Sequence, residues 1–174
     1  MEFLKTKFEN AFLINFTSHT DERGSFFRFY CQNEFKENSI NINWIQMNHS
    51  INKEKGTIRG LHFQVEPYSE IKLVRCIKGS VFDVIVDLRK DSDTYLQWQS
   101  FELSSKNCNA ILIPKGFAHG FQTLEKNSEL IYLHSEYYNK EYERGIYFND
   151  KSLNIKWPIK KIIISSKDTS HPKI

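Results

Sequence analysis

The sequence has few of the residues that interrupt regular structure. Its 174 residues include only 7 glycines and 4 prolines, spread along the chain, and it contains no repeat and no low-complexity linker. Without a linker there is no obvious boundary between domains, so residues 1–174 are predicted to form one domain. The apolar content of 40%, with 14% aromatic residues, is enough for a sizeable core.

Cysteine is also scarce. Cys31, Cys76 and Cys108 are odd in number and widely spaced, and no CxxC pair occurs. This pattern argues against a disulfide framework and against a thiolate metal site. The three thiols are therefore predicted to be structural.

Long apolar runs and an excess of one charge are absent as well. Charges at Glu2, Lys5, Lys7 and Glu9 interrupt the N-terminal segment, and no run approaches the roughly 20 residues of a membrane span. The 24 basic residues are interleaved with 21 acidic ones, for a net charge of +3. We therefore expect a cytoplasmic protein with neither a membrane nor a nucleic acid as partner.

Strand patterns dominate what is present. Residues 80–89 alternate between Phe82, Val84, Val86 and Leu88 on one face and Asp83, Ile85, Asp87 and Arg89 on the other, which predicts a half-buried strand. Further apolar or aromatic runs cover residues 72–79, 109–114 and 128–138, whereas short helices are expected only at 32–37 and 140–144. The pattern predicts an all-β sandwich of the jelly-roll type.

The segment RGLHFQ at residues 59–64, followed by Lys72, is the first candidate for chemistry. In an extended segment His62 points away from the apolar Leu61 and Phe63, and a neighbouring strand could bring Lys72 to the same side. A sandwich interior that accepts charged side chains is normally a ligand pocket, because an unpaired buried lysine is costly. The alternative is that His62 is a hydrogen-bonded or exposed strand residue.

His119 and Tyr132 are weaker candidates. His119 lies beside Gly120 and between aromatic residues, which is typical either of a backbone close to a ligand or of a turn, and Tyr132 is either a cavity residue or amphipathic core. Position 64 is glutamine, so no His-x-His pair follows His62, and the other histidines lack ligand-like spacing. No metal site is predicted.

The ordered set of these segments resembles one family, the dTDP-4-dehydrorhamnose 3,5-epimerases. The matching segments are DERG (21–24), QMNHS (46–50), RGLHFQ, KLVRC (72–76), GSVFDVIVDLRKDS (79–92), IPKGFAHGF (113–121), the Tyr132 strand with its Tyr-Tyr pair (137–138), ERGI (143–146) and SKD (166–168). The resemblance implies a cupin-type double-stranded β-helix (jelly roll) with a few short helices and no metal or cofactor. It also implies a homodimer that acts on nucleotide-linked 4-keto-6-deoxy sugars in surface-polysaccharide synthesis.

The resemblance assigns roles residue by residue. His62 resembles the base that removes a proton beside the ketone, and Asp168 resembles its carboxylate partner. Lys72 resembles the lysine that stabilises the enolate, and Tyr132 resembles the residue that supplies a proton from the opposite face of the ring. Inversion requires two groups on two faces, because a base that returns its own proton restores the starting configuration.

Further positions resemble residues that bind the nucleotide, the diphosphate or the sugar. They are Arg23, Gln46, Asn48, Arg59, His119, Glu143 and Lys167, with Tyr138 stacking on the base. Cations suit a diphosphate and an aromatic ring suits a planar base. Arg59 and His62 differ by an odd number of residues, so both can face one cavity only if the strand is irregular, and a kink at Gly60 is predicted.

Three departures from the family bear on the substrate. Arg28 stands where a glutamate is usual, Met47 stands where an aspartate is common, and Glu70 with Ile71 stands where Gln-Gly usually precedes the lysine. The nucleotide is accordingly left open between dTDP and GDP, and a GDP-linked 4-keto-6-deoxy sugar, such as a heptose, is a candidate substrate. Three alternatives stay open: an epimerase of carbon 3 only, a sugar 3,4-ketoisomerase, and a cupin that binds a nucleotide sugar without catalysis.

Overall fold

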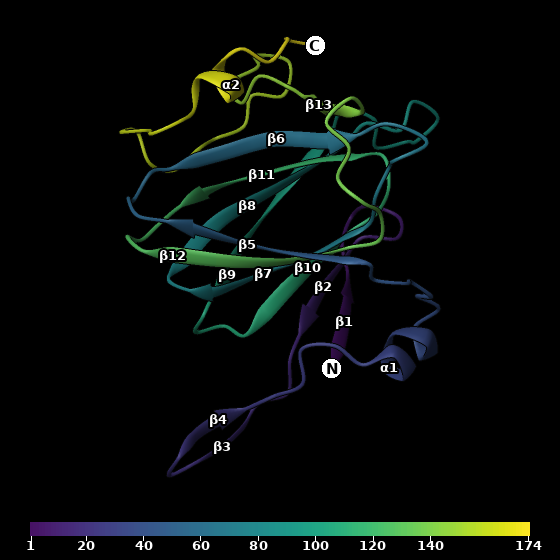
Figure 1. Cartoon of the computed structure of the whole chain (residues 1–174), viewed down its shortest axis with the longest axis vertical. Helices are drawn as coiled ribbons and strands as arrows, with labels where there is room; N and C mark the ends of the chain where they lie inside the picture. Colours follow the sequence, from purple (N-terminus) through teal and green to yellow (C-terminus); the bar gives the residue numbers. More distant parts are fainter.

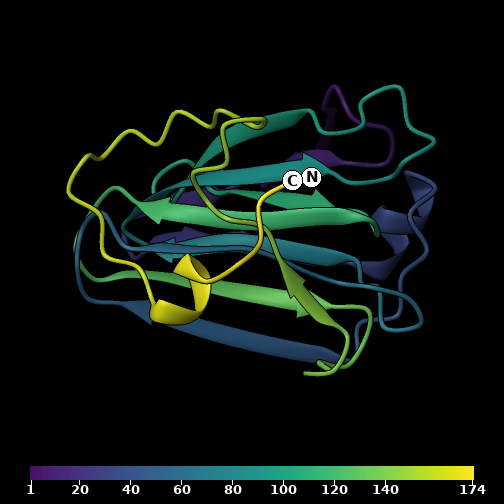
Figure 2. The same ribbon diagram turned by 90° about the horizontal axis from the view of Figure 1, so that it is seen from above.

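The computed structural model describes residues 1–174 as two facing antiparallel sheets with a small hairpin and two short helices (Figures 1 and 2). The larger sheet contains, in spatial order, β1 (Glu2–Lys5), β2 (Phe12–Asn15), β10 (Asn109–Ile113), β7 (Lys72–Lys78), β12 (Ser128–His134) and β5 (Gln46–Asn52). The smaller sheet contains β13 (Glu143–Gly145), β6 (Ile58–Gln64), β11 (Phe117–Thr123), β8 (Ser80–Asp87) and β9 (Trp98–Ser104). The all-β sandwich prediction is confirmed.

The core between the two sheets is built from inward-facing residues of both. Val74 and Cys76 of β7 meet Val81 and Ile85 of β8 in a cluster of 13 buried apolar residues. Each of these four side chains is completely buried. On β8, however, the core residues Val81 and Ile85 share the face of Asp83, so the apolar face of Phe82, Val84 and Val86 that identified the strand points away from this core.

The prediction that residues 80–89 are half-buried is wrong, because β8 is buried on both faces. Its outer residues Val84 and Val86 pack with Ile146, Leu153 and Ile155 of the segment that follows β13. The segment after β13 thus covers part of the outside of the smaller sheet. Alternation within one strand does not reveal a second layer supplied by a distant segment.

The helix predictions were right in one place and wrong in another. Helix α1 (Gln32–Glu37) matches the expected segment, but residues 140–144 form no helix and instead lead into β13. Helix α2 (Ser166–Thr169) was not expected and carries Asp168. Neither helix has the length or the apolar content needed to cross a bilayer.

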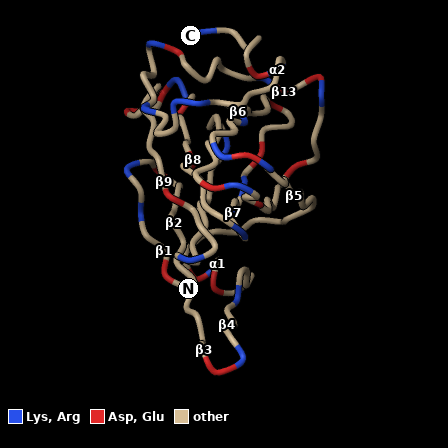
Figure 3. Tube along the Cα trace, turned by 90° about the vertical axis from the view of Figure 1, so that its left-hand side faces the viewer, with Lys and Arg blue, Asp and Glu red and all other residues tan.

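A two-stranded hairpin of β3 (His19–Asp21) and β4 (Gly24–Phe26) projects from the body of the molecule, at the end opposite α2 (Figure 1). All of its strand residues are exposed, and Phe26 exposes 74% of its surface. Acidic and basic residues meet at its tip (Figure 3). The hairpin pairs with neither large sheet.

Candidate active site

A cavity of about 240 Å³ lies between the two sheets. It is lined from both sides by Asn48, His49, Ser50, Arg59, His62, Lys72, His119, Phe121, Tyr132 and His134. A larger groove of about 860 Å³ beside the β1–β2 turn is lined by none of the predicted site residues. Because the smaller cavity is lined by half of the predicted site residues, six of the twelve, we take it as the candidate active site.

An irregularity in β6 brings two of these side chains to the same face. His62 pairs with His119 of β11, whereas Arg59 pairs with Phe121, so three residue steps on β6 match two on β11. The extra residue forms a bulge at Gly60, whose φ of +112° favours glycine. The predicted kink is confirmed, and it explains how Arg59 and His62 both line the cavity despite their odd spacing.

His62 is held by a carboxylate from the far end of the chain. Its Nε2 lies 2.8 Å from Oδ1 of Asp168, and the other Asp168 oxygen accepts a hydrogen bond from the Gly60 N–H at 3.2 Å. Burial alone would raise the pKa of Asp168, but the hydrogen bond and charge of His62, together with the Gly60 N–H, hold that pKa below its usual value. Asp168 therefore stays ionised at neutral pH and orients the imidazole.

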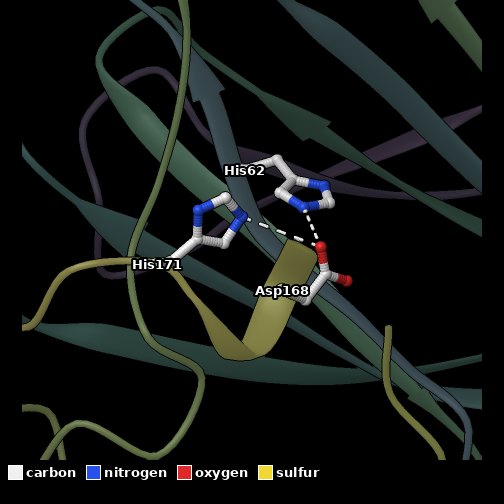
Figure 4. Close-up of side chains that lie close together, drawn as sticks. All are labelled: His62, Asp168 and His171. Atoms are coloured by element: carbon white, nitrogen blue, oxygen red, sulfur yellow. Dashed lines mark hydrogen bonds and ion pairs between the residues drawn. The ribbon is translucent and has the colours of Figure 1, made fainter. Parts of the chain in front are cut away.

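A second histidine, which the sequence did not connect to the site, lies beside this pair (Figure 4). The His171 Nε2 is 3.7 Å from Oδ1 of Asp168, and the His62 and His171 rings meet edge to face with centroids 5.3 Å apart. Burial and the nearby charge of His62 lower the pKa of His171. The three potential ligand atoms lie within 4.8 Å of one another. Because Asp168 already accepts from His62 at 2.8 Å, we interpret the group as a base and its carboxylate.

Lys72 lies on the opposite sheet, at the start of β7. Its Nζ is 3.1 Å from Oε1 of Glu70, and Oε2 of the same carboxylate is 2.6 Å from Nδ1 of His134. Burial would raise the pKa of Glu70, but the His134 hydrogen bond and the Lys72 charge lower it overall. The sequence showed Glu70 only as a departure from the family, and it did not link His134 to the site.

Tyr132, on β12, has its hydroxyl 3.1 Å from Oγ of Ser50. Burial raises the pKa of this phenol, so the hydroxyl keeps its proton at neutral pH. Tyr132 belongs to the larger sheet and His62 to the smaller one, and both line the same cavity. A substrate held between the sheets would thus meet one proton-transfer group on each side.

His119 is placed in the cavity wall as predicted, with a buried partner that the sequence analysis did not assign to the site. Its Nε2 lies 2.8 Å from Oδ2 of Asp83, and both side chains are buried. Arg59, also in the wall, donates from Nε to Oδ1 of Asn52 at 2.7 Å. Neither Asp83 nor Asn52 could be linked to these residues from spacing, because each contact joins two different strands.

Most of the remaining predicted binding residues form a group beside the cavity. Glu143 accepts hydrogen bonds from the Tyr138 hydroxyl at 2.8 Å and from Lys167 Nζ at 2.6 Å. The Tyr138 N–H donates to Gln46 at 3.1 Å, and Gln46 donates to Asn48 at 3.2 Å. Because β13, which carries Glu143, pairs with β6, this group adjoins the strand of His62.

Arg23 is the one predicted binding residue that the chain brings neither to the cavity nor to the group beside it. It lies in the turn between β3 and β4, and its guanidinium bonds to Asp21 of the same hairpin. The hairpin is at the far end of the molecule from β6 and α2 (Figure 1). Within one chain, Arg23 therefore cannot serve the site that contains His62.

A family model and a full-length relative of this chain give the same family. A family model described as dTDP-4-dehydrorhamnose 3,5-epimerase matches residues 5–174. A dTDP-4-dehydrorhamnose 3,5-epimerase of Shigella flexneri is 42% identical over 174 residues, which cover 99% of this chain and 96% of the relative.

Two solved structures extend the likeness to the fold. The Bacillus anthracis epimerase, solved with TDP and PPi bound, superposes with a TM-score of 0.97 at 40% identity and covers 99% of both chains. The Legionella pneumophila enzyme, in complex with dTDP-4-keto-L-rhamnose, gives a TM-score of 0.94 at 35% identity over 99% of this chain and 92% of that chain.

Proposed function

Because the chain belongs to the dTDP-4-dehydrorhamnose 3,5-epimerase family, we propose that it inverts carbon 3 and carbon 5 of a dTDP-linked 4-keto-6-deoxy sugar. Membership makes the protein an isomerase, and its sandwich is the cupin-type jelly roll of the solved epimerases. One observation carries the proposal. His62 with its carboxylate lies on one wall of the cavity, and Tyr132 lies on the wall formed by the other sheet.

His62 is proposed as the base. Its Nε2 is engaged with Asp168, so Nδ1 is the nitrogen free to take the proton from the carbon beside the ketone. The imidazolium that forms is stabilised by the ionised carboxylate. His62 exposes 30% of its side chain in spite of that bond, so a substrate can reach it.

Lys72 is proposed to stabilise the enolate. When the proton leaves, the electron pair of the C–H bond moves into the carbon skeleton and negative charge develops on the ketone oxygen. An ammonium fixed close to that oxygen can lower the barrier by about 3 kcal/mol. Lys72 fits this role because its side chain is mostly buried and is held by Glu70.

Tyr132 is proposed to deliver the proton on the other face. Its hydroxyl gives a proton to the enolate carbon, which restores the ketone with the opposite configuration. The cycle leaves His62 protonated and Tyr132 deprotonated, so each must exchange with solvent before the next turnover. The raised pKa of Tyr132 drives its reprotonation.

The nucleotide end is proposed to bind beside the cavity. Tyr138 exposes 54% of its surface next to Glu143 and Lys167, so its ring is available to a base while the lysine suits a phosphate. Gln46, Asn48, Arg59 and His119 would contact the diphosphate or sugar between this group and His62. The relatives described above are named for dTDP or TDP, and the GDP-linked heptose that the sequence departures suggested has no support from them.

A homodimer is proposed because the site lacks one residue. Arg23 is exposed on a hairpin that cannot reach its own cavity, and strand β5, which carries Gln46 and Asn48, is an unpaired edge of the larger sheet. A hairpin from a second copy could bring Arg23 to the cavity and lie along the free edge of β5. That residues 1–174 form one domain stays a prediction.

Incubation with 4-keto nucleotide sugars in deuterated water tests the function. Two deuterons in the product indicate exchange at carbons 3 and 5, and one deuteron indicates an epimerase of a single carbon. A product with the ketone moved to carbon 3 would mean a ketoisomerase, and binding without exchange would mean a non-catalytic cupin. His62→Ala should abolish exchange, and activity should survive chelation by EDTA if the reaction needs no metal.

A further inference from the structure

A continuous chain of side chains joins the nucleotide end of the site to Lys72. It runs along the larger sheet, where Tyr132 of β12 faces Asn48 of β5, and His134 of β12 lies between Gln46 of β5 and Lys72 of β7. Asn48 Nδ2 is 3.2 Å from Nε2 of His134, and Nδ1 of His134 is 2.6 Å from Glu70. Glu70 then meets Lys72 at 3.1 Å.

The hydrogen bonds of this chain converge on Glu70, from the nucleotide end on one side and from Lys72 on the other. The Tyr138 N–H donates to the oxygen of Gln46, and the Gln46 amide donates to the oxygen of Asn48. The Asn48 amide then donates to Nε2 of His134, which must carry its proton on Nδ1 and give it to Glu70. Each donor finds an acceptor only if Glu70 offers two acceptor oxygens, as an ionised carboxylate does.

Glu70 stands behind the cavity wall. Lys72 and His134 line the cavity, whereas Glu70 does not and bridges them from the protein side. Each of the three side chains exposes 12% or less of its surface. A lysine alone has four flexible torsions, so an ammonium fixed by a buried carboxylate loses far less entropy when it meets the developing charge.

We propose that Glu70 and His134 are positioning residues, which hold the Lys72 ammonium at the place where the ketone oxygen of the substrate binds. The inference rests on the proposed function, in which Lys72 stabilises the enolate. It gives the carboxylate at position 70 a reason: His134 supplies a second donor that a glutamine there could not accept together with Lys72. Glu70 and His134 act through Lys72 and need not touch the substrate.

Because Glu70 accepts from both His134 and Lys72, the variant Glu70→Gln tests the inference directly. Glutamine has nearly the same volume but only one oxygen, so either Lys72 or His134 loses its acceptor. If His134 moved its proton to Nε2 to accept from the new amide, it would face the donor group of Asn48. The change should therefore weaken the contact that holds the Lys72 ammonium without leaving a cavity at position 70.

The experiment measures kcat and KM on a dTDP-linked 4-keto-6-deoxy sugar. Glu70→Gln should lower kcat about tenfold or more, because misplacement of a catalytic group by about 1 Å is that costly, while KM stays within about twofold. In a Lys72→Ala background the same change should have no further effect. His134→Ala should also lower kcat, and the double variant Glu70→Gln with His134→Ala should be no worse than the poorer single variant.

Glu129→Gln is the matched control. Glu129 also bridges a lysine and a histidine, Lys78 and His49, at 3.0 and 3.1 Å. Its lysine, unlike Lys72, does not line the cavity, and His49, although it lies in the cavity wall, has no proposed role in the reaction. Its replacement should leave kcat unchanged. If Glu70→Gln proves too unstable to assay, Glu70→Asp keeps the buried charge but is too short to reach both partners, and it should lower kcat in the same way.

Two results would overturn the inference. One is a Glu70→Gln enzyme with the kcat of the wild type, and the other is an equal fractional loss of kcat in the presence and in the absence of Lys72. Both require an active wild type. A wild-type protein that exchanges no deuterium into any 4-keto nucleotide sugar would instead contradict the proposed function itself.

Discussion

Three of the four histidines in the cavity wall bond to a buried carboxylate, and their exposure separates their roles, whereas the fourth, His49, bonds to the partly exposed Glu129. The pairs are His62 with Asp168 at 2.8 Å, His119 with Asp83 at 2.8 Å and His134 with Glu70 at 2.6 Å. In each pair the carboxylate fixes the ring orientation and the tautomer. His62 exposes 30% of its side chain, against 6% for His119 and 9% for His134. Of the three histidines with a buried carboxylate, His62 is therefore the one most open to a substrate carbon; His49 exposes 42% but lacks such a partner.

Tyr132→Phe should separate proton exchange from inversion. The variant loses the hydroxyl that delivers the proton but keeps the ring, so inversion should fall by about a hundredfold or more. His62 would still remove the proton, exchange it with solvent and return it to the same face. NMR in deuterated water should then detect deuterium in unreacted substrate without the inverted product. A parallel loss of exchange and inversion would argue against Tyr132 as the second proton-transfer group.

Site residues that belong to a sequence motif were predictable, whereas those that reach the site only through contacts in the folded chain were not. His62, Lys72, Tyr132 and Asp168 were identified in the sequence, and the structure brings all four to one cavity region. The hydrogen bond between Glu70 and His134 was not predicted, because 64 positions separate the two residues and neither of them was assigned a role in the site from the sequence. Contacts between strands distant in sequence leave no local signal.

At the scale of elements, α2 shows why a functional helix escaped sequence analysis. It has four residues, too few for helix propensity to hold it. The Ser165 side chain caps it by accepting a hydrogen bond from the backbone N–H of Asp168 at 3.1 Å. Strands β7, β8 and β12, in contrast, were predictable because their apolar patterns extend over seven or eight residues, whereas strands of three residues such as β3, β4 and β13 were not predicted. A helix whose stability comes from one cap and from tertiary contacts has no comparable pattern.

Ser165→Ala should therefore reduce both stability and activity. Loss of the cap costs about 1 kcal/mol of unfolding free energy, and it frees the residue that orients His62. We expect a lower kcat with little change in KM, measured beside urea unfolding. Ser170→Ala is the control, because the Ser170 hydroxyl donates to the Lys167 carbonyl at the other end of the helix. Equal effects of the two changes on kcat would count against a specific role for the cap.

The projecting hairpin is attached to the body by an unusual contact at its base. The Arg75 guanidinium of β7 lies 4.2 Å from the ring centre of Phe27, with Phe16 and Phe29 also nearby. Burial lowers the pKa of Arg75, and no carboxylate pairs with it. Cation–π contacts of this kind contribute about 1 kcal/mol each and fix the direction in which the hairpin leaves the sandwich.

At the scale of the whole molecule, the proposed dimer can be tested by complementation. If the hairpin of one subunit completes the site of the other, a mixed dimer of Arg23→Ala and His62→Ala subunits contains one site with both residues intact. Unfolding and refolding the two weak variants together should then give more activity than either variant alone. Size-exclusion chromatography of the mixture checks that dimers form. Activity equal to the average of the separate variants would contradict the shared site.

Stability should fall in acid. Burial alone would raise the pKa of Asp87, but hydrogen bonds from Arg89, Thr94 and Ser92 lower it, and the pKa of Asp168 is lowered in the same sense. Groups with a lowered folded pKa contribute stability that is complete above their unfolded value of roughly 4 and is lost as pH falls through the folded value. Urea unfolding should show a plateau near neutrality and a decline below about pH 4. Asp87→Asn should make that decline shallower, and an unchanged slope would contradict this account.

The placement of His62 and Tyr132 on different sheets has a consequence for evolution and engineering. Facing sheets pack about 10 Å apart, and core side chains such as Val74 and Ile85 set that spacing. Whether His62 and Tyr132 can reach opposite faces of a sugar ring therefore depends on the volume of core residues that do not contact the sugar. Enlarging or shrinking the core beneath the cavity is expected to alter which carbon is inverted before it alters whether a proton is removed.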